Sequence, residues 1–180
     1  MGKYYLAKLL CQYCQAYLVF MEDKSRKCTS CGYTVNPGEE PNVITLKELL
    51  SGNDLKVQPL EILDNLDVLL LKMNKVRVAY DKAMIVTSGL RSMDHHVDIY
   101  KALAKQRKMT FDMLKVPMDS NHLKGKAVDI SDPDGKLYKW CEDNVKLLEE
   151  IGLWLELSDD QPRVHFQITP PKSGLRFFKP

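Results

Sequence analysis

The sequence predicts an α+β protein in which a small cysteine-rich domain precedes a larger domain of helices and short strands. Three observations predict this: two Cys-x-x-Cys pairs near the N-terminus, a leucine-rich stretch with helical spacing after them, and short apolar strands later in the chain. Helices come first and strands later without regular alternation, which favours α+β over a doubly wound sheet. The 180 residues suffice for one ordinary domain and a small appendage.

The composition is that of an ordinary globular chain. Hydrophobic residues are 44% and charged residues 28%, which excludes wholesale disorder and a coiled-coil rod. Lys plus Arg is 26 against 24 for Asp plus Glu, so no bulk basic field favours nucleic-acid binding. No apolar run approaches the ~20 residues that span a bilayer. The first residues lack a long apolar segment, so we expect no secretory signal and a protein that is cytoplasmic as synthesised.

Four of the five cysteines form two Cys-x-x-Cys pairs, Cys11 with Cys14 and Cys28 with Cys31, separated by thirteen residues. Such a turn points two thiolates at one centre, and two turns joined by a hairpin complete a tetrahedral zinc site. In a reducing compartment the pattern favours a metal over disulfides. A four-thiolate site has no open position, so its zinc is predicted to be structural. A pair of redox-active or incidental motifs is the alternative interpretation. The fifth cysteine, Cys141, is predicted to be a partly buried spectator in a helix.

A polar, turn-rich segment at 36–41 predicts the domain boundary. We therefore expect a zinc ribbon over residues 1–40, with strands at 16–21 and near 33–35, and a second domain over residues 41–180. The elements expected in the second domain are helices at 45–50 with Thr45 as N-cap, 60–70, 97–108 and 139–151, and strands at 83–88, 126–130, 154–156 and 164–169.

The pattern Ser120-x-His122-x-x-Gly125-x-Ala127-x-Asp129 is the most informative segment of the chain. Ala127 and Asp129 share one face of the expected strand, and a turn at Gly125 would fold His122 back beside Asp129.

A second segment, Val164-His165-Phe166-Gln167, places His165 and Gln167 on one strand face and Phe166 on the other. Two histidines and one aspartate supply three ligands for zinc and leave a fourth position open for water, as catalytic zinc sites do. Each of these residues alone is more often a hydrogen-bonded structural residue, so the prediction depends on the combined pattern.

These two motifs, in this order, resemble those of the zinc D,D-peptidase family, which includes D-alanyl-D-alanine carboxypeptidases and phage endolysins and shares its fold with the hedgehog signalling domain. The resemblance covers roughly Thr45 to Pro180, and the upstream Ser88-Gly89-Leu90-Arg91 is similar to the family's Ser-Gly-x-Arg element. It implies a small antiparallel sheet with flanking helices.

The resemblance also implies roles for individual residues. It implies that His122, Asp129 and His165 bind zinc and that Arg91 contacts a substrate carboxylate or the scissile carbonyl; a surface ion pair is the alternative for Arg91. Gln167 is a further candidate for substrate binding. Ser120 is expected either to bond near the metal or substrate, or to cap the turn.

The general base is less well defined. The family usually carries an acidic residue a few positions before the last histidine, often three, but position 162 is Pro162. The candidates are Glu156, Asp159 and Asp160. Glu156, at the end of an apolar strand, is the one that we favour as the base.

His95 and His96 form a separate pair in the sequence. We expect them in the turn that opens a helix, with Asp94 as the N-cap. A further metal site or a substrate contact is the alternative.

The function implied is that of a zinc-dependent hydrolase, a metallopeptidase that cuts the stem peptide of bacterial peptidoglycan. With no export signal expected, a phage enzyme that degrades the cell wall after holin-type release, or from within a virion, fits the sequence. Two alternatives stay open: a catalytically inactive zinc-containing module that binds cell wall or protein, and a zinc-ribbon protein that binds nucleic acid. Two zinc ions are expected, one structural and one catalytic, with no nucleic acid and no membrane insertion.

Overall fold

The computed structural model describes residues 18–20, 26–28, 30, 34–35, 44–157 and 162–179. The predicted boundary segment at 36–41 lies outside these residues. Three short strands precede residue 44 and form an antiparallel sheet in the order β1-β2-β3 (β1 Leu18–Phe20, β2 Arg26–Cys28, β3 Thr34–Val35). Strands were expected at the positions of β1 and β3, but β2 was not, and it lies between them as the partner of both.

The helix α1 (Leu46–Leu50) begins and ends as its sequence predicts. Thr45 is the N-cap, and with Glu48 it forms a capping box, in which the Glu48 amide donates to the Thr45 hydroxyl and the Thr45 amide donates to the Glu48 carboxylate. Ser51 ends the helix in the left-handed conformation.

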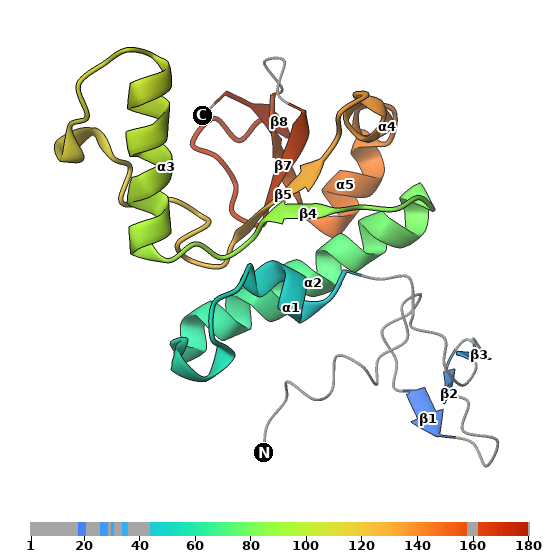
Figure 1. The fold of residues 1–180 in the computed structure, drawn as a ribbon. Helices are drawn as coiled ribbons and strands as arrows, with labels where there is room; N and C mark the ends of the chain where they lie inside the picture. The colour runs from blue at the N-terminus through green and yellow to red at the C-terminus, as the bar shows by residue number, and fades with distance from the viewer. Residues whose placement is uncertain are drawn as a thin grey trace.

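The long helix α2 (Leu60–Tyr80) contributes one continuous buried apolar face to the main hydrophobic core. It contacts α1 and α5, and Figure 1 shows it running beneath the sheet. The helix extends ten residues beyond the leucine-rich stretch that predicted it, because Met73 and Val76 continue the buried face to the end.

The second sheet has the strand order β4-β5-β7-β6-β8. All of its neighbouring strands are antiparallel except β6 and β8, which are parallel. The strands are β4 Val86–Ser88, β5 Ala127–Ser131, β6 Trp154–Glu156, β7 Arg163–Gln167 and β8 Phe177–Phe178. The strand β8 was not expected from the sequence.

Strand alternation divides this sheet into an apolar face and a polar face. Val128, Ile130, Leu155, Val164 and Phe166 are buried in the core cluster that α2 completes. The residues between them therefore point to the opposite face, and they include the histidine and aspartate of the predicted metal site. The core thus fixes which side of the sheet carries the site.

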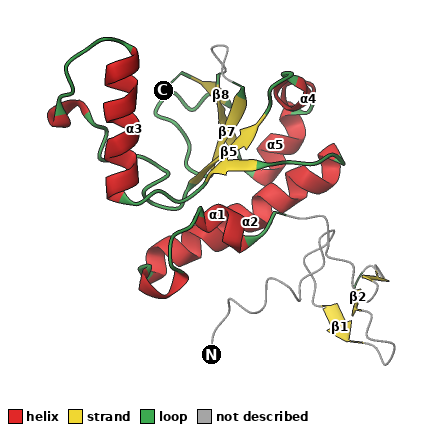
Figure 2. Ribbon diagram, in the orientation of Figure 1, coloured by secondary structure: helices red, strands yellow, loops and turns green. Residues whose placement is uncertain are grey.

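Two of the expected helices differ in the structure. A single helix was predicted over 139–151, but α4 (Lys136–Asp143) and α5 (Val145–Ile151) are separate. They break at Asn144, whose φ of −120° and ψ of 32° lie outside the helical region and whose side chain donates to the Trp140 carbonyl. Figure 2 shows the two helices at the same end of the sheet.

The helix α3 (Met93–Gln106) begins earlier than predicted, and its N-cap is Ser92 rather than Asp94. The Ser92 hydroxyl accepts from the His95 amide, so Asp94 lies inside the first turn. His95 is exposed, whereas His96 is buried and its Nε2 donates to the Pro117 carbonyl. The expected position of both histidines in the opening turn is confirmed, and the N-cap lies two residues earlier than predicted.

Gly89 permits a close approach of two segments of the backbone. A Cβ at this position would lie 2.1 Å from the Leu49 carbonyl oxygen, and the neighbouring Leu90 amide donates to that same oxygen. The glycine therefore lets the chain after β4 lie directly against the end of α1.

Replacing Gly89 by alanine should lower the free energy of unfolding by about 1–3 kcal/mol, since the clashing atoms are backbone and cannot rotate away. Urea denaturation followed by circular dichroism measures this. An unchanged midpoint would show that the two segments can separate without cost.

The described structure is therefore a mixed α+β protein with a small five-stranded sheet, as predicted. Within the part of the chain that the structure describes, none of the helices combines the length and apolar character that a membrane-crossing segment needs.

Candidate metal centre

The turn before β5 brings His122 to the edge of the sheet. The Ser120 and Asn121 carbonyls accept from the Leu123 and Lys126 amides. Gly125 closes the turn with a φ of +66°, a conformation that favours glycine. This is the turn that the spacing predicted, and it places the imidazole against Asp129.

The sheet itself brings Asp129 and His165 together. Asp129 on β5 lies directly opposite His165 on β7, so both side chains project from the same face at neighbouring positions. Phe166, the next residue along β7, is fully buried in the core on the other face. The predicted division of β7 between a polar and an apolar face is therefore confirmed.

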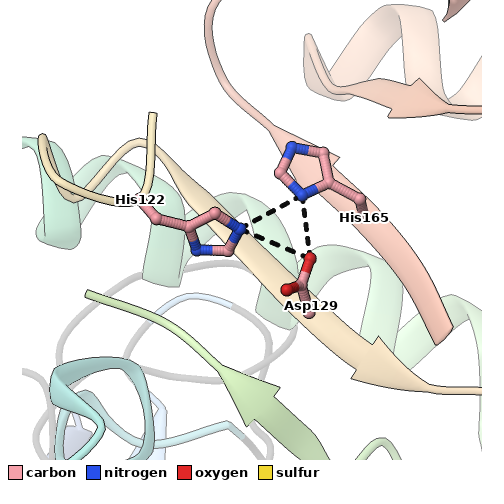
Figure 3. A group of neighbouring side chains, drawn as sticks. All are labelled: His122, Asp129 and His165. Carbon is pink, nitrogen blue, oxygen red and sulfur yellow. Dashed lines mark hydrogen bonds and ion pairs between the residues drawn. The ribbon is translucent and has the colours of Figure 1, made fainter. Parts of the chain in front are cut away.

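Three ligand atoms converge on one point in Figure 3. His165 Nδ1 lies 2.8 Å from Asp129 Oδ1, and His122 Nε2 lies 3.4 Å from that oxygen and 3.3 Å from His165 Nδ1. Ligands bound at 2.0–2.1 Å to a tetrahedral ion are separated from each other by about 3.3 Å. The triangle thus has nearly the size that a small tetrahedral cation requires, and these three residues could hold a metal ion.

The far side of each imidazole ring is fixed by an oxygen acceptor. His122 Nδ1 donates to the Gly89 carbonyl at 2.8 Å, and His165 Nε2 lies 3.4 Å from Gln167 Oε1. The Gln167 amide nitrogen donates to the Thr169 carbonyl, which orients Oε1 toward His165. With those nitrogens protonated, His122 Nε2 and His165 Nδ1 carry lone pairs, as metal-binding histidines do.

Three acceptor atoms this close to one another need a cation between them, either a proton or a metal ion. Burial lowers the pKa of His122, despite its contact with Asp129, and so favours the neutral imidazole that binds metals. Burial alone would raise the pKa of Asp129, but without a metal ion the facing histidine nitrogens can carry a proton and donate to Oδ1, and such hydrogen bonds from His122 and His165 hold this pKa well below its usual range. The carboxylate is therefore ionised, and the set suits a metal ion.

Arg91 lies at this centre, on the far side of the aspartate. Its guanidinium donates to Asp129 Oδ2 at 2.8 Å and to the Ser88 hydroxyl at 2.9 Å, and its amide donates to the His122 carbonyl at 3.1 Å. These contacts bind Arg91 to the metal-ligand residues, whereas its expected contact with a substrate stays a prediction.

The other two predicted substrate contacts have structural partners. Gln167 is buried, and its Oε1 also accepts from the Asn121 amide at 2.9 Å, so both ends of its side chain are engaged. Ser120 is half-buried and closes the turn through its carbonyl.

Glu156 is placed by the register of β6 on β7. Trp154 lies opposite Gln167 and Leu155 opposite Phe166, where the pairing of β6 with β7 ends, and Glu156 pairs with Phe178 on β8. Glu156 comes two residues after Trp154 and so shares its face of the sheet. Opposite residues project to the same face, which puts the half-buried Glu156 on the face that carries the metal ligands. Asp159 and Asp160 lie outside the described residues.

Two residues of the centre were missed by the sequence reasoning. Arg163 donates to Asp129 Oδ2 at 2.8 Å, and Asn121 holds Gln167. Arg163 stands two residues before His165, so strand alternation could have placed it on the same face. For Asn121 no signal existed, because its partner lies 46 residues away.

Of the four cysteines predicted to bind structural zinc, the structure describes Cys28; Cys11, Cys14 and Cys31 lie outside the described residues. Cys28 ends β2 and is buried, and the Ser30 amide lies 3.4 Å from its sulfur. Backbone amides make contacts of this kind with the sulfurs of metal-binding cysteines. Cys141 lies in α4 and is fully buried rather than partly buried as predicted, and burial raises the pKa of its thiol.

Replacing Gln167 by methionine should weaken metal binding by about 10-fold, since outer partners of metal ligands contribute 10- to 100-fold to affinity. Methionine keeps the volume but gives His165 no comparable acceptor. Competition with a chromophoric chelator measures the affinity, and Gln106→Met, at the exposed end of α3, is the matched control. Equal affinities in the two variants would mean that Gln167 does not orient the ring.

Comparison with known proteins returned no relative for this chain. Neither the protein-family models, nor the curated proteins, nor the solved structures gave a match.

Proposed function

We propose that this protein is a zinc-dependent peptidase that hydrolyses a peptide bond in the stem peptide of bacterial peptidoglycan. The observation that carries the proposal is the convergence of His122 Nε2, Asp129 Oδ1 and His165 Nδ1. The other nitrogen of each imidazole faces an oxygen acceptor, the Gly89 carbonyl for His122 and Gln167 Oε1 for His165. Two histidines and a carboxylate are a ligand set typical of catalytic zinc, which keeps a further position open. The substrate class comes from the resemblance of the motifs to the zinc D,D-peptidase and endolysin family.

In this proposal a zinc ion at the centre would supply Lewis-acid polarisation of the scissile carbonyl and a lowered pKa for the attacking water. Glu156 accepts the proton of that water on its carboxylate and then donates it to the leaving amine. Its place on the face of the sheet that carries the metal ligands supports this assignment. Arg91 keeps the Asp129 carboxylate in place through Oδ2.

The finer description of the fold is part of the same proposal. We assign the second domain a hedgehog- and D,D-peptidase-like architecture, supported by the antiparallel pairing of β4, β5, β7 and β6 with helices against one face. We assign residues 1–40 to a ribbon with one structural zinc, supported by the strands β1 to β3 and by the contact at the Cys28 sulfur.

The test is mass spectrometry of purified peptidoglycan after incubation with the protein, with and without a chelator, and with His122→Ala beside it. New fragments should appear with the native protein, vanish in both controls and return when zinc is restored, and their masses name the bond. Intact muropeptides from several wall chemotypes, with zinc bound to the protein, would overturn the proposal and favour an inactive wall-binding module.

A further inference from the structure

The two oxygens of the Asp129 carboxylate have different partners. Oδ1 faces the histidines, at 2.8 Å from His165 Nδ1 and 3.4 Å from His122 Nε2. Oδ2 accepts from two guanidinium groups, those of Arg91 and Arg163, each at 2.8 Å. The arginines thus occupy the oxygen that lies away from the ligand triangle.

The two arginines approach from opposite sides of β5. Arg91 follows β4 and is nearly buried, with 10% of its side chain exposed and its Nε donating to Ser88. Arg163 comes from β7, and 37% of its side chain is exposed. Asp129 lies between them with no exposed side-chain surface, so its carboxylate is held from both neighbouring strands.

A carboxylate oxygen has about two lone-pair directions for hydrogen bonds or metal ions. On Oδ2 both are used by charge-assisted bonds to guanidinium, which are among the strongest hydrogen bonds in proteins. Only Oδ1 remains for a cation beside the histidines. Ca²⁺ readily takes both oxygens of a carboxylate at six to eight ligands, and Mn²⁺ prefers octahedral oxygen sites, whereas Zn²⁺ is satisfied by four ligands.

We propose that Arg163 is a positioning residue that, with Arg91, confines Asp129 to one ligand oxygen and so makes the centre selective for tetrahedral cations over Mn²⁺. The inference rests on the metal centre of the proposed function, but not on the peptidase activity.

If Arg163 acted only through its positive charge, its removal would change the metal affinities in a different way from the removal of a positioning residue. A nearby guanidinium repels every divalent cation, so its removal raises the affinity for Zn²⁺ and Mn²⁺ together. Confinement of Asp129 changes the ratio of the Zn²⁺ affinity to the Mn²⁺ affinity. Removal of Arg163 frees one lone pair on Oδ2, and this extra ligand position favours Mn²⁺, which takes more ligands than Zn²⁺. The ratio therefore separates positioning from charge.

The experiment measures that ratio in the full chain, with the cysteine site kept filled with zinc. Zn²⁺ displaces Mn²⁺ while electron paramagnetic resonance follows the bound Mn²⁺, and the visible spectrum of Co²⁺ reports the coordination number. The variants are Arg163→Met, Arg163→Lys as the conservative replacement, and Arg107→Met, an exposed arginine at the end of α3, as the matched control.

Arg163→Met should raise the affinity for Mn²⁺ relative to Zn²⁺ by about 10-fold, at the lower end of the effect of outer partners on metal sites. Its Co²⁺ bands should weaken as the coordination number rises. Arg163→Lys should fall between Arg163→Met and the native protein, and Arg107→Met should match the native protein.

A native ratio and a native Co²⁺ spectrum in Arg163→Met would overturn the inference and leave the metal centre intact. A native protein that binds neither Co²⁺ nor Mn²⁺ at the open centre would overturn both. A shifted ratio in a protein that leaves peptidoglycan intact would support the inference and contradict the peptidase proposal alone.

Discussion

Replacing His122 by alanine is expected to abolish metal binding at the open centre and hydrolysis with it. The side chain supplies one of three ligand atoms, and its loss leaves Asp129 and His165 as a two-ligand site. The affinity should fall by more than about 100-fold, the upper end of the effect of losing an outer partner. Elemental analysis by mass spectrometry should find two zinc ions in the native protein and one in the variant.

The matched control for this change is His95→Ala. His95 is exposed in the first turn of α3, and it contributes to the cap through its amide rather than its ring. This variant should keep both zinc ions and full activity. Two zinc ions in His122→Ala, or a loss of zinc in His95→Ala, would contradict the assignment of ligands.

Replacing Glu156 by glutamine is expected to lower kcat by about 10²- to 10⁴-fold, the usual contribution of a general acid–base group. Glutamine keeps the shape of the side chain and its place on the face of the sheet that carries the metal ligands but cannot take a proton from water. Zinc content and the free energy of unfolding should stay at native values. Steady-state hydrolysis of muropeptides measures kcat and KM separately, and KM is expected to change little.

Glu149→Gln, on the exposed surface of α5, is the control for the loss of one acidic group. Asp159→Asn and Asp160→Asn test the other two candidates that the sequence offers. If either of these lowers kcat while Glu156→Gln does not, the base lies in segment 158–161. Native kcat in all three would mean that none of these carboxylates is the base.

The parts of the centre that sequence reasoning found are those that local geometry determines. His122 reaches Asp129 through a turn that a glycine with positive φ closes, and Asp129 and His165 follow from strand alternation. These features depend on a few neighbouring residues, so spacing predicts which face each residue occupies. That His165 joins Asp129, 36 residues away, was implied instead by the resemblance of the two motifs to the zinc D,D-peptidase family.

The parts that it missed depend on pairings between distant segments. The bond from Arg163 to Asp129 joins residues 34 apart, and that from Asn121 to Gln167 joins residues 46 apart. The parallel pairing of β8 with β6 and the insertion of β2 between β1 and β3 are also set by register. A periodic pattern records which face a residue occupies, but not which strand lies beside it.

The break between α4 and α5 has another cause. Apolar residues recur with helical spacing through both helices, so the pattern predicts one helix. Asn144 interrupts it because its side chain bonds to the Trp140 carbonyl and its backbone leaves the helical region. A single polar residue inside an apolar pattern was too weak a signal for that break.

The most direct test of the metal centre is anomalous diffraction at the zinc absorption edge from crystals of the full chain. We predict a peak about 2.0–2.1 Å from His122 Nε2, Asp129 Oδ1 and His165 Nδ1, the range for zinc bound to nitrogen and oxygen. A second peak, at the cysteine pairs, would be independent of the first. Crystals grown with excess zinc that show no anomalous density among these three atoms would contradict the account, and would leave a protonated histidine paired with Asp129 in its place.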